Sequence, residues 1–263
     1  MKKHIYSSAL LALLTLASIQ VSAQEEEEMQ HVGPDMRISA GITFGSLSYF
    51  GDIGYGTHND LVSFATERRM FGLIGQKRLT DYIGVSGNLL FGRISKSERS
   101  NQPSRNKNFL SNIIQLDGQL MLHSDNDLTL AYDIEMAPYL AAGVGFMYFN
   151  SKTDLKAGNT DYYYWTNGKI MNRAENAPDA INAKEMNRDY VYETKLDSSH
   201  AAFTFPLTLG VTFKLHENVQ ADIKGSLYFT TTDYLDGYDN GVTGGVDMFS
   251  MVGVSVRYFL PEF

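Results

Sequence analysis

The chain has 263 residues, enough for one substantial domain, and contains no cysteine. Disulfide bonds, thiol chemistry and cysteine-based metal sites are therefore excluded. Its formal net charge of -8 at pH 7 argues against a nucleic-acid partner, which would call for a basic surface. The 16 tyrosines, 15 phenylalanines and 23 glycines, set against 6 prolines, favour an all-β chain.

Residues 1–23 have the three parts of a secretory signal peptide. Lys2 and Lys3 supply the positive start, residues 9–19 form an apolar run, and Val21-Ser22-Ala23 fits a signal peptidase site. A membrane-spanning helix would need about 20 apolar residues, so this run is too short to be an anchor. We expect residues 24–35, with the acidic run Glu25–Glu28, to be a solvated segment, and residues 36–263 to be a single domain.

Hydrophobic alternation with a period of two is the strongest signal in the rest of the chain. It repeats in segments of about ten residues, the pattern of membrane-spanning strands with one lipid face and one lumen face. The alternation is clearest in the last three segments and less strict in the earlier ones. The segments expected to be strands are residues 37–48, 68–79, 82–94, 108–122, 138–150, 203–215, 219–230 and 252–260.

The connections between these segments alternate in length. Residues 79–82 and 216–218 are tight turns, whereas residues 49–67, 95–107, 151–200 and 233–245 are long and polar. Outer-membrane barrels have short periplasmic turns and longer extracellular loops, and a periplasmic N-terminus places every long connection outside. The connection 124–137 is long for a periplasmic turn, and we interpret part of it as a strand extension.

We therefore predict an antiparallel transmembrane β-barrel of about eight strands in the cell outer membrane, with long extracellular loops and periplasmic termini. A soluble lipocalin-like barrel is the main alternative, because it shows the same alternation with the apolar face turned inward. The gathering of the long connections on one side favours the membrane barrel.

A barrel of about eight strands has room inside only for side chains, so no open channel is expected. The strand directions turn several charged residues inward near the periplasmic end. These are Arg37, Asp222, Lys224 and Arg257, with Asp117 as a further member. Because charges removed from water persist only when paired, we expect a salt-bridge network that plugs the lumen. A proton or ion path through the same residues is the alternative.

Two long connections hold further candidate residues. Asp233, Asp236 and Asp239 could offer oxygen ligands to calcium, but their spacing does not match an EF-hand loop, and turn formation is favoured. The connection 151–200 holds an aromatic cluster of Tyr162, Tyr163, Tyr164 and Trp165. We interpret this cluster as the packing of a lid over the barrel mouth, with sugar stacking or partner docking as the alternative.

No grouping of catalytic residues is visible. The histidines lie on different connections, without an HExxH or Ser-His-Asp arrangement, so we expect neither catalysis nor a cofactor.

Four short motifs follow one another along the chain: Tyr49–Asp52, Ala137–Phe146, Tyr163–Gly168 and Thr232–Asp236. In this order they resemble an outer-membrane β-barrel family common in Bacteroidota, whose relatives include type IX secretion-associated barrels and OmpA-type N-terminal barrels. The final segment, with Tyr258 and a terminal Phe263, resembles the sorting signal that such barrels present to the barrel assembly machinery. The resemblance implies outer-membrane lipid, that machinery and other envelope or secretion proteins as partners, and it gives no substrate.

The leading interpretation is a non-enzymatic barrel with a structural or partner-binding role, linked to type IX secretion machinery. A narrow pore or ligand-uptake barrel is the alternative. A soluble lipocalin-like binder and a membrane-embedded enzyme follow.

Overall fold

The structure is a computed structural model. It describes residues 33–51, 69–97, 107–154, 156–157, 159–188, 190, 200–237 and 247–261. The chain divides into two units, Met1–Gly33 and Pro34–Phe263, and the folded domain lies in the second. The expected signal peptide and acidic run therefore lie outside the described residues, as do Asp239 and Phe263.

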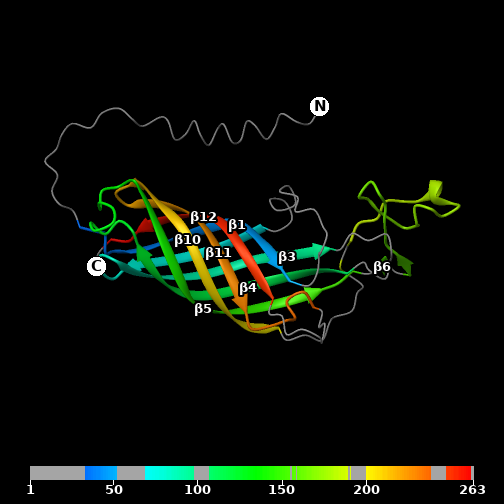
Figure 1. The fold of residues 1–263 in the computed structure, drawn as a ribbon, viewed down its shortest axis with the longest axis horizontal. Helices are drawn as coiled ribbons and strands as arrows, with labels where there is room; N and C mark the ends of the chain where they lie inside the picture. The colour runs from blue at the N-terminus through cyan, green and yellow to red at the C-terminus, as the bar shows by residue number, and fades with distance from the viewer. Residues whose placement is uncertain are drawn as a thin grey trace, which may run out of the picture. The chain divides into compact units, whose positions relative to one another are not determined.

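Eight long antiparallel strands form one closed barrel (Figure 1). They are β1 (Ile38–Phe50), β2 (Arg69–Arg78), β3 (Ile83–Ser97), β4 (Asn108–His123), β5 (Met136–Lys152), β10 (Ala201–His216), β11 (Val219–Thr230) and β12 (Met248–Phe259). The sheet closes where β1 pairs with β12, from Ser39 opposite Phe259 to Phe50 opposite Met248. Closure leaves no edge strand with unpaired backbone groups. Strands in lipid need such closure, because no water is present to bond to unpaired groups. The predicted fold class is confirmed.

Each predicted strand is present, with ends shifted by a few residues. The largest shift is in β12, which begins at Met248 instead of residue 252. β5 begins at Met136, so the strand extension expected within residues 124–137 includes only the last two of these residues. The rest of that expectation is wrong, because the residues before Met136 form turns and bends. Asn126 is the physical reason, since its side-chain oxygen accepts hydrogen bonds from the backbone N–H groups of Leu128 and Thr129.

The two ends of the barrel differ in their connections. One end, here the turn end, carries residues 79–82, 124–135 and 217–218, and both described ends of the barrel chain meet there. The other, here the loop end, carries residues 51–68, 98–107, 153–200 and 231–247. All the long connections except 124–135 therefore share one end, as the alternation in length predicts.

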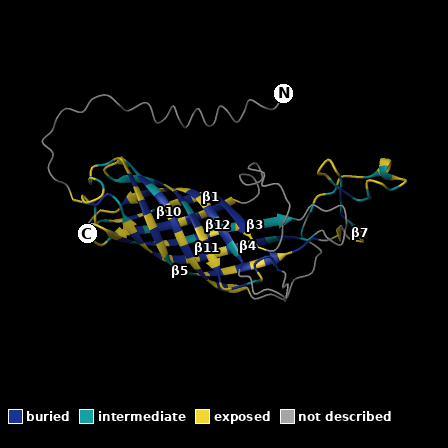
Figure 2. Cartoon of the chain, in the orientation of Figure 1, coloured by how far each residue is buried: buried dark blue, intermediate teal, exposed yellow. Residues whose placement is uncertain are grey.

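Buried and exposed residues alternate along most of the barrel wall (Figure 2), although the four residues Ser46–Tyr49 of β1 are all buried. On β10 the outward residues include Phe203 and Leu209, which are 62% and 67% exposed, and the buried ones include Thr208 and Thr212. Apolar side chains covering the outside of a barrel suit lipid and not water. A soluble lipocalin-like barrel has a polar exterior, so the apolar exterior excludes that alternative.

Two inward glycines permit close packing of neighbouring strands. A Cβ atom on Gly41 would lie 2.0 Å from the carbonyl oxygen of Val256, and one on Gly143 would lie 2.0 Å from that of Gly118. A larger residue at either position would separate the strands.

Short elements occur in the connection between β5 and β10. The pairs are β6 (Lys156–Ala157) with β7 (Thr160–Asp161) and β8 (Tyr163–Tyr164) with β9 (Ile170–Met171), followed by the 3-10 helix η2 (Ala180–Asn182). None of the helices in the described residues is long and apolar enough to cross a membrane.

Candidate functional site in the barrel interior and at the loop end

A buried ion pair lies in the half of the lumen nearer the turn end. Arg257 on β12 donates from Nε to Asp222 Oδ2 at 2.7 Å and from Nη2 to Asp222 Oδ1 at 2.8 Å. The Arg257 and Asp222 side chains are 4% and 0% exposed. This two-point contact is the strongest geometry available to an arginine and a carboxylate.

Three further polar side chains form hydrogen bonds with this ion pair. Arg257 also donates to Ser39 Oγ at 2.9 Å and to Gln220 Oε1 at 3.1 Å, and Thr212 donates to Asp222 Oδ1 at 2.7 Å. The pair therefore connects β1, β10, β11 and β12 from inside the barrel. Because its polar atoms have partners, the ion pair is tolerated away from water.

A second polar group begins beside the ion pair on β11 and reaches across the lumen to β3 and β4. Lys224 on β11 donates to Asn88 Oδ1 at 3.1 Å. Asn88 in turn donates to Asp117 Oδ1 at 2.8 Å, and Gln119 donates to the same oxygen at 2.8 Å. The structure thus brings together four residues of the expected interior network, namely Asp117, Asp222, Lys224 and Arg257, with Asn88 as an unexpected bridge.

The contacts of Arg37 lie at the turn end, with residues that the expected network did not include. Its guanidinium binds Asp35 at 2.7 Å and Asn218 Oδ1 at 2.8 Å, and it lies 5.0 Å from the centre of the Phe259 ring. The reason is that β1 begins at Ile38, so the strand alternation used to place Arg37 does not extend to it.

The connection 124–135 closes the turn end of the lumen. The Asp125 carboxylate forms ion pairs with Arg78 on β2 at 3.0 Å and with Lys214 on β10 at 3.4 Å. In the order of the barrel, β2 and β10 lie on opposite sides, with three strands between them in either direction. The Asp125 carboxylate therefore bridges the mouth, a role that the sequence pattern gives no sign of.

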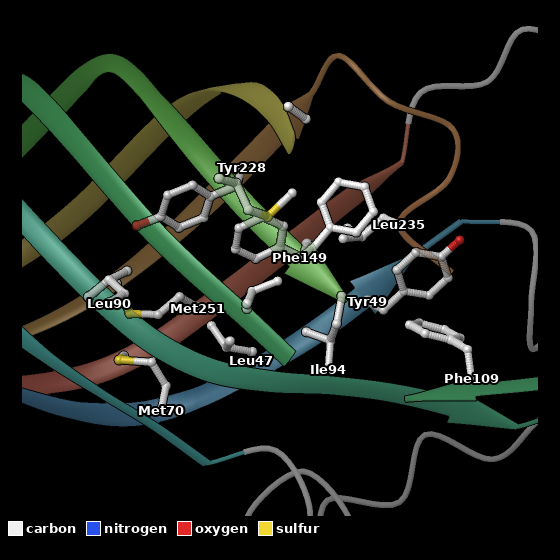
Figure 3. Close-up of a cluster of buried hydrophobic side chains, with 14 residues drawn as sticks. Leu47, Tyr49, Met70, Leu90, Ile94, Phe109, Phe149, Tyr228, Leu235 and Met251 are labelled. Carbon is white, nitrogen blue, oxygen red and sulfur yellow. The ribbon is translucent and has the colours of Figure 1, made fainter. Parts of the chain in front are cut away.

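An apolar cluster occupies much of the lumen nearer the loop end, a feature that the sequence pattern did not predict. Its members come from all the long strands and from the connection 231–247: Leu47, Tyr49, Met70, Leu90, Ile94, Phe109, Ile113, Met147, Phe149, Ala202, Tyr228, Leu235, Phe249 and Met251. Tyr228 and Phe249 stack with ring centres 4.5 Å apart, and Leu235 is fully buried against its neighbours (Figure 3). Polar side chains are buried in this half as well, since Gln115 donates to Thr204 Oγ1 at 2.7 Å and Ser151 donates to Ser111 Oγ at 3.0 Å.

Two buried carboxyl groups meet one tyrosine hydroxyl above this cluster. The Tyr49 hydroxyl lies 2.8 Å from Asp236 Oδ2 and 2.6 Å from Asp247 Oδ1. A hydroxyl has one hydrogen to donate, so both contacts are satisfied together only when one carboxyl carries a proton. Burial, with a contribution from Asp236, raises the pKa of Asp247 to about 7 although the Tyr49 hydrogen bond lowers it.

These contacts fix the connection 231–247 over the lumen. The backbone N–H of Leu235 donates to Asp247 Oδ2 at 2.8 Å, and Ser151 donates to the Leu235 carbonyl oxygen at 2.7 Å. Asp236 is thus engaged by Tyr49, and Asp239 lies outside the described residues. Within the described residues no group of three or more His, Cys, Asp or Glu side chains is placed to hold a metal, so the calcium candidate with Asp233 is not assembled there.

The aromatic cluster of the connection 151–200 makes contacts within its own segment and with the end of β3. Tyr162 and Tyr164 are buried, and the Arg188 guanidinium lies 4.9 Å and 5.7 Å from their ring centres. Tyr164 shares a 2.6 Å hydrogen bond with Ser97 at the end of β3, and Trp165 donates to the Arg173 carbonyl oxygen at 2.8 Å. Buried ring faces do not suit sugar stacking, and the barrel mouth itself is filled by the apolar cluster.

The remaining sequence candidates lie apart from one another. Tyr258 faces outward on β12 and is 51% exposed. His123 and His216 end their strands at the turn end, whereas His200 lies at the loop end. The described histidines therefore form no common site with a nucleophile.

One known family matches the chain, and several solved barrels are similar to it. The sequence profile described as "Outer membrane protein beta-barrel domain" matches residues 9–259. No curated protein matches significantly.

Three similar structures illustrate the fold. Ail, the attachment invasion locus protein of Yersinia pestis, solved with the heparin analogue sucrose octasulfate, is 12% identical over 86% of this chain and 100% of its own, with a TM-score of 0.40. Neisserial surface protein A is 9% identical over 85% and 97%, with a TM-score of 0.44. OprG of Pseudomonas aeruginosa is 10% identical over 88% and 99%, with a TM-score of 0.41.

A single and a double variant together test whether the charges of the Arg257–Asp222 pair affect the stability of the barrel. Arg257→Gln leaves a buried carboxylate without its cation, which should lower the free energy of unfolding by about 3–5 kcal/mol. The double variant Arg257→Gln/Asp222→Asn should be more stable than Arg257→Gln, although it lacks one more native group. Urea unfolding in lipid vesicles, followed by circular dichroism, measures both, and Lys77→Gln, which changes an exposed cation opposite Val85, is the control. Equal stability of the single and double variants would contradict a charge effect.

Asp247 should make the barrel less stable as the pH rises. Its pKa is higher in the folded protein than in the unfolded chain, so the folded state binds more protons between pH 4 and 7, and its stability falls across that interval. We expect the melting temperature in detergent to fall from pH 4.5 to pH 8, and Asp247→Asn to reduce this fall. Asp161→Asn, which changes an exposed carboxylate, is the matched control. An unchanged pH profile in Asp247→Asn would argue against this assignment.

Proposed function

Because this chain belongs to the outer membrane protein beta-barrel domain family, we propose that it is a non-conducting, non-enzymatic barrel that binds protein partners through its loop end. The observation that supports this most strongly is the filled lumen. A barrel of this size can act as a channel only if inward side chains leave a passage. Where they leave none, the surfaces available for function are the loop end and the lipid-facing exterior.

Three successive layers of side chains obstruct the lumen. At the turn end Asp125 bridges opposite strands through Arg78 and Lys214. The middle layer holds the Arg257–Asp222 pair and the Lys224 group. The apolar cluster, closed by Leu235, fills the loop-end half. An ion would need to displace both paired charges and tightly packed apolar groups to cross.

We propose that the turn end and both termini face the periplasm and that the loop end faces outward. The contrast between short and long connections supports this orientation, because outer-membrane barrels place their long loops outside.

The described part of the connection 153–200 has features of a binding surface. It is internally ordered, since β8 pairs with β9 and Met186 N–H donates to the Ile170 carbonyl oxygen at 2.8 Å. It also presents Ile181, an apolar side chain that is 94% exposed, on the helix η2. An ordered segment loses little conformational entropy when it binds, which favours recognition of another protein.

We propose proteins of the cell envelope as the partners, with the type IX secretion apparatus of Bacteroidota as the first assembly to test. The support is the resemblance in the four motifs from Tyr49–Asp52 to Thr232–Asp236.

The purified chain should not conduct ions in planar lipid bilayers. Variants that disturb one layer each, Asp125→Asn, Arg257→Gln and Phe249→Ala, should also stay silent, because each leaves two layers in place. Single-channel recording over a range of salt concentrations makes this measurement. A steady, ion-selective current from the unaltered chain would overturn the non-conducting proposal and favour the pore alternative.

Single cysteines can test orientation and partner binding together, since the chain has none of its own. Ile181→Cys on η2 and Leu128→Cys at the turn end both replace highly exposed residues. A membrane-impermeant, thiol-reactive photo-crosslinker applied to intact cells should give a protein adduct of defined mass with Ile181→Cys alone. Labelling of Leu128→Cys alone would reverse the orientation, and labelling of Ile181→Cys without any protein adduct would count against a partner at this segment.

A further inference from the structure

A row of polar side chains crosses the outward face of five neighbouring strands, β1 to β5, near the loop end. Ser46 lies opposite Arg69, Arg93 opposite Asn112, and Asn112 opposite Asn150. Arg69 and Arg93 are themselves neighbours, because the adjacent residues Met70 and Gly92 face each other. We name these five residues the outer polar row. All except Ser46 are exposed.

An apolar row runs directly beside it, two residues nearer the turn end on each strand. Its members are Phe44, Phe71, Phe91, Ile114 and Tyr148, each opposite the next. All are large and between 41% and 53% exposed, so they belong to the lipid-facing band. The outer polar row therefore lies at the border where that band ends, the level of lipid headgroups.

Among the described residues, the outer polar row carries two positive charges and no negative one. Arg69 and Arg93 face the same side of adjacent strands, and like charges opposite each other destabilise a sheet. Lys152, opposite Leu110, adds a further exposed cation one step nearer the loop end. Within the described residues, no Asp or Glu faces outward in the loop-end halves of β1 to β5.

Two exposed lysines elsewhere at the loop end have acidic partners. Lys169 contacts Glu185 at 2.5 Å, and Lys156 contacts Asp161 at 3.5 Å. By contrast, the Arg93 guanidinium donates to the neutral side chain of Asn112 at 3.1 Å. The row thus offers several hydrogen-bond donors and two like charges to an anion that comes from outside the chain.

We propose that the outer polar row binds the phosphate groups of a phosphorylated glycolipid in the outer leaflet of the membrane. The guanidinium groups of Arg69 and Arg93 match phosphate oxygens in two-point contacts. The exposed side chains of Asn112 and Asn150 are suited to sugar hydroxyls beside the phosphate. The apolar row commits the site to a lipid, because acyl chains of the same molecule would lie against Phe44, Phe71 and Phe91, surfaces that a free phosphate leaves unused.

The proposal rests on the proposed orientation, in which the loop end lies at the outer leaflet. Lys77 provides an internal comparison. It is an exposed cation on the outward face of the same strand, β2, but at the turn end and without a second cation opposite, where Val85 lies. A general attraction between basic groups and lipid would involve Lys77 as much as the arginines, whereas a specific site would not.

The test uses the full chain folded in zwitterionic detergent, so its result does not depend on orientation in cells. The probes are diphosphoryl lipid A, the same lipid after removal of both phosphates, and inorganic phosphate, with binding followed by native mass spectrometry. The unaltered chain should retain the diphosphoryl lipid in preference to the dephosphorylated one. Arg69→Gln/Arg93→Gln should weaken retention by about tenfold or more, as expected for two lost charge-assisted contacts. Lys77→Gln should change it by less than about twofold.

Three results would overturn the proposal. They are equal retention of the phosphorylated and dephosphorylated lipids, unchanged binding in Arg69→Gln/Arg93→Gln, and an equal loss in Lys77→Gln. Displacement of the lipid by millimolar inorganic phosphate would assign the site to free phosphate instead. Heat-modifiable migration on gels checks that each variant is folded before the titration. Failure here leaves the cysteine crosslinking result intact, so the lipid site and the proposed partner role are tested separately.

Discussion

The pairing of β1 with β12 is the interaction on which the rest of the structure depends. Backbone groups of strands in hydrocarbon must all be bonded within the sheet, and only closure achieves this. The register from Ser39–Phe259 to Phe50–Met248 provides the last set of these bonds. Once the barrel is closed, every outward side chain faces lipid and every inward one faces a narrow lumen. The inward side chains must then satisfy one another, because little water can reach them.

The lumen meets this requirement in two different ways. Nearer the turn end, polar groups share partners, and Arg257 on β12 reaches both Asp222 on β11 and Ser39 on β1. This ion pair therefore spans the closing seam from inside. Nearer the loop end large apolar side chains occupy most of the space by packing. The inward polar groups there are paired with one another, as Gln115 is with Thr204. The two halves together explain a closed lumen better than either would alone.

The strands could be predicted because period-two alternation is strong wherever one face is polar, as in β10 and β11. The same alternation turns Asp222, Lys224 and Arg257 inward, as the structure does, whereas Arg37, which precedes β1, contacts Asp35 and Asn218. It also failed to reveal the apolar cluster. Where Met147 and Phe149 face inward between outward Phe146 and Tyr148, both faces are apolar and the contrast disappears. The bridge made by Asp125 was beyond prediction, since it depends on a turn reaching across the barrel.

The loop end shows how closely the two faces of a strand are linked. On β2, Met70 packs in the apolar cluster while Arg69 belongs to the outer polar row, and on β3, Ile94 and Arg93 divide in the same way. A shift of register by one residue would exchange them, placing guanidinium groups in the apolar lumen and apolar groups among the headgroups. Both outcomes are costly, the first because an unpaired buried charge is poorly tolerated. The packing of the apolar cluster inside and the charge of the outer polar row outside therefore favour the same register. The apolar cluster thus helps to position the surface that we propose for the glycolipid.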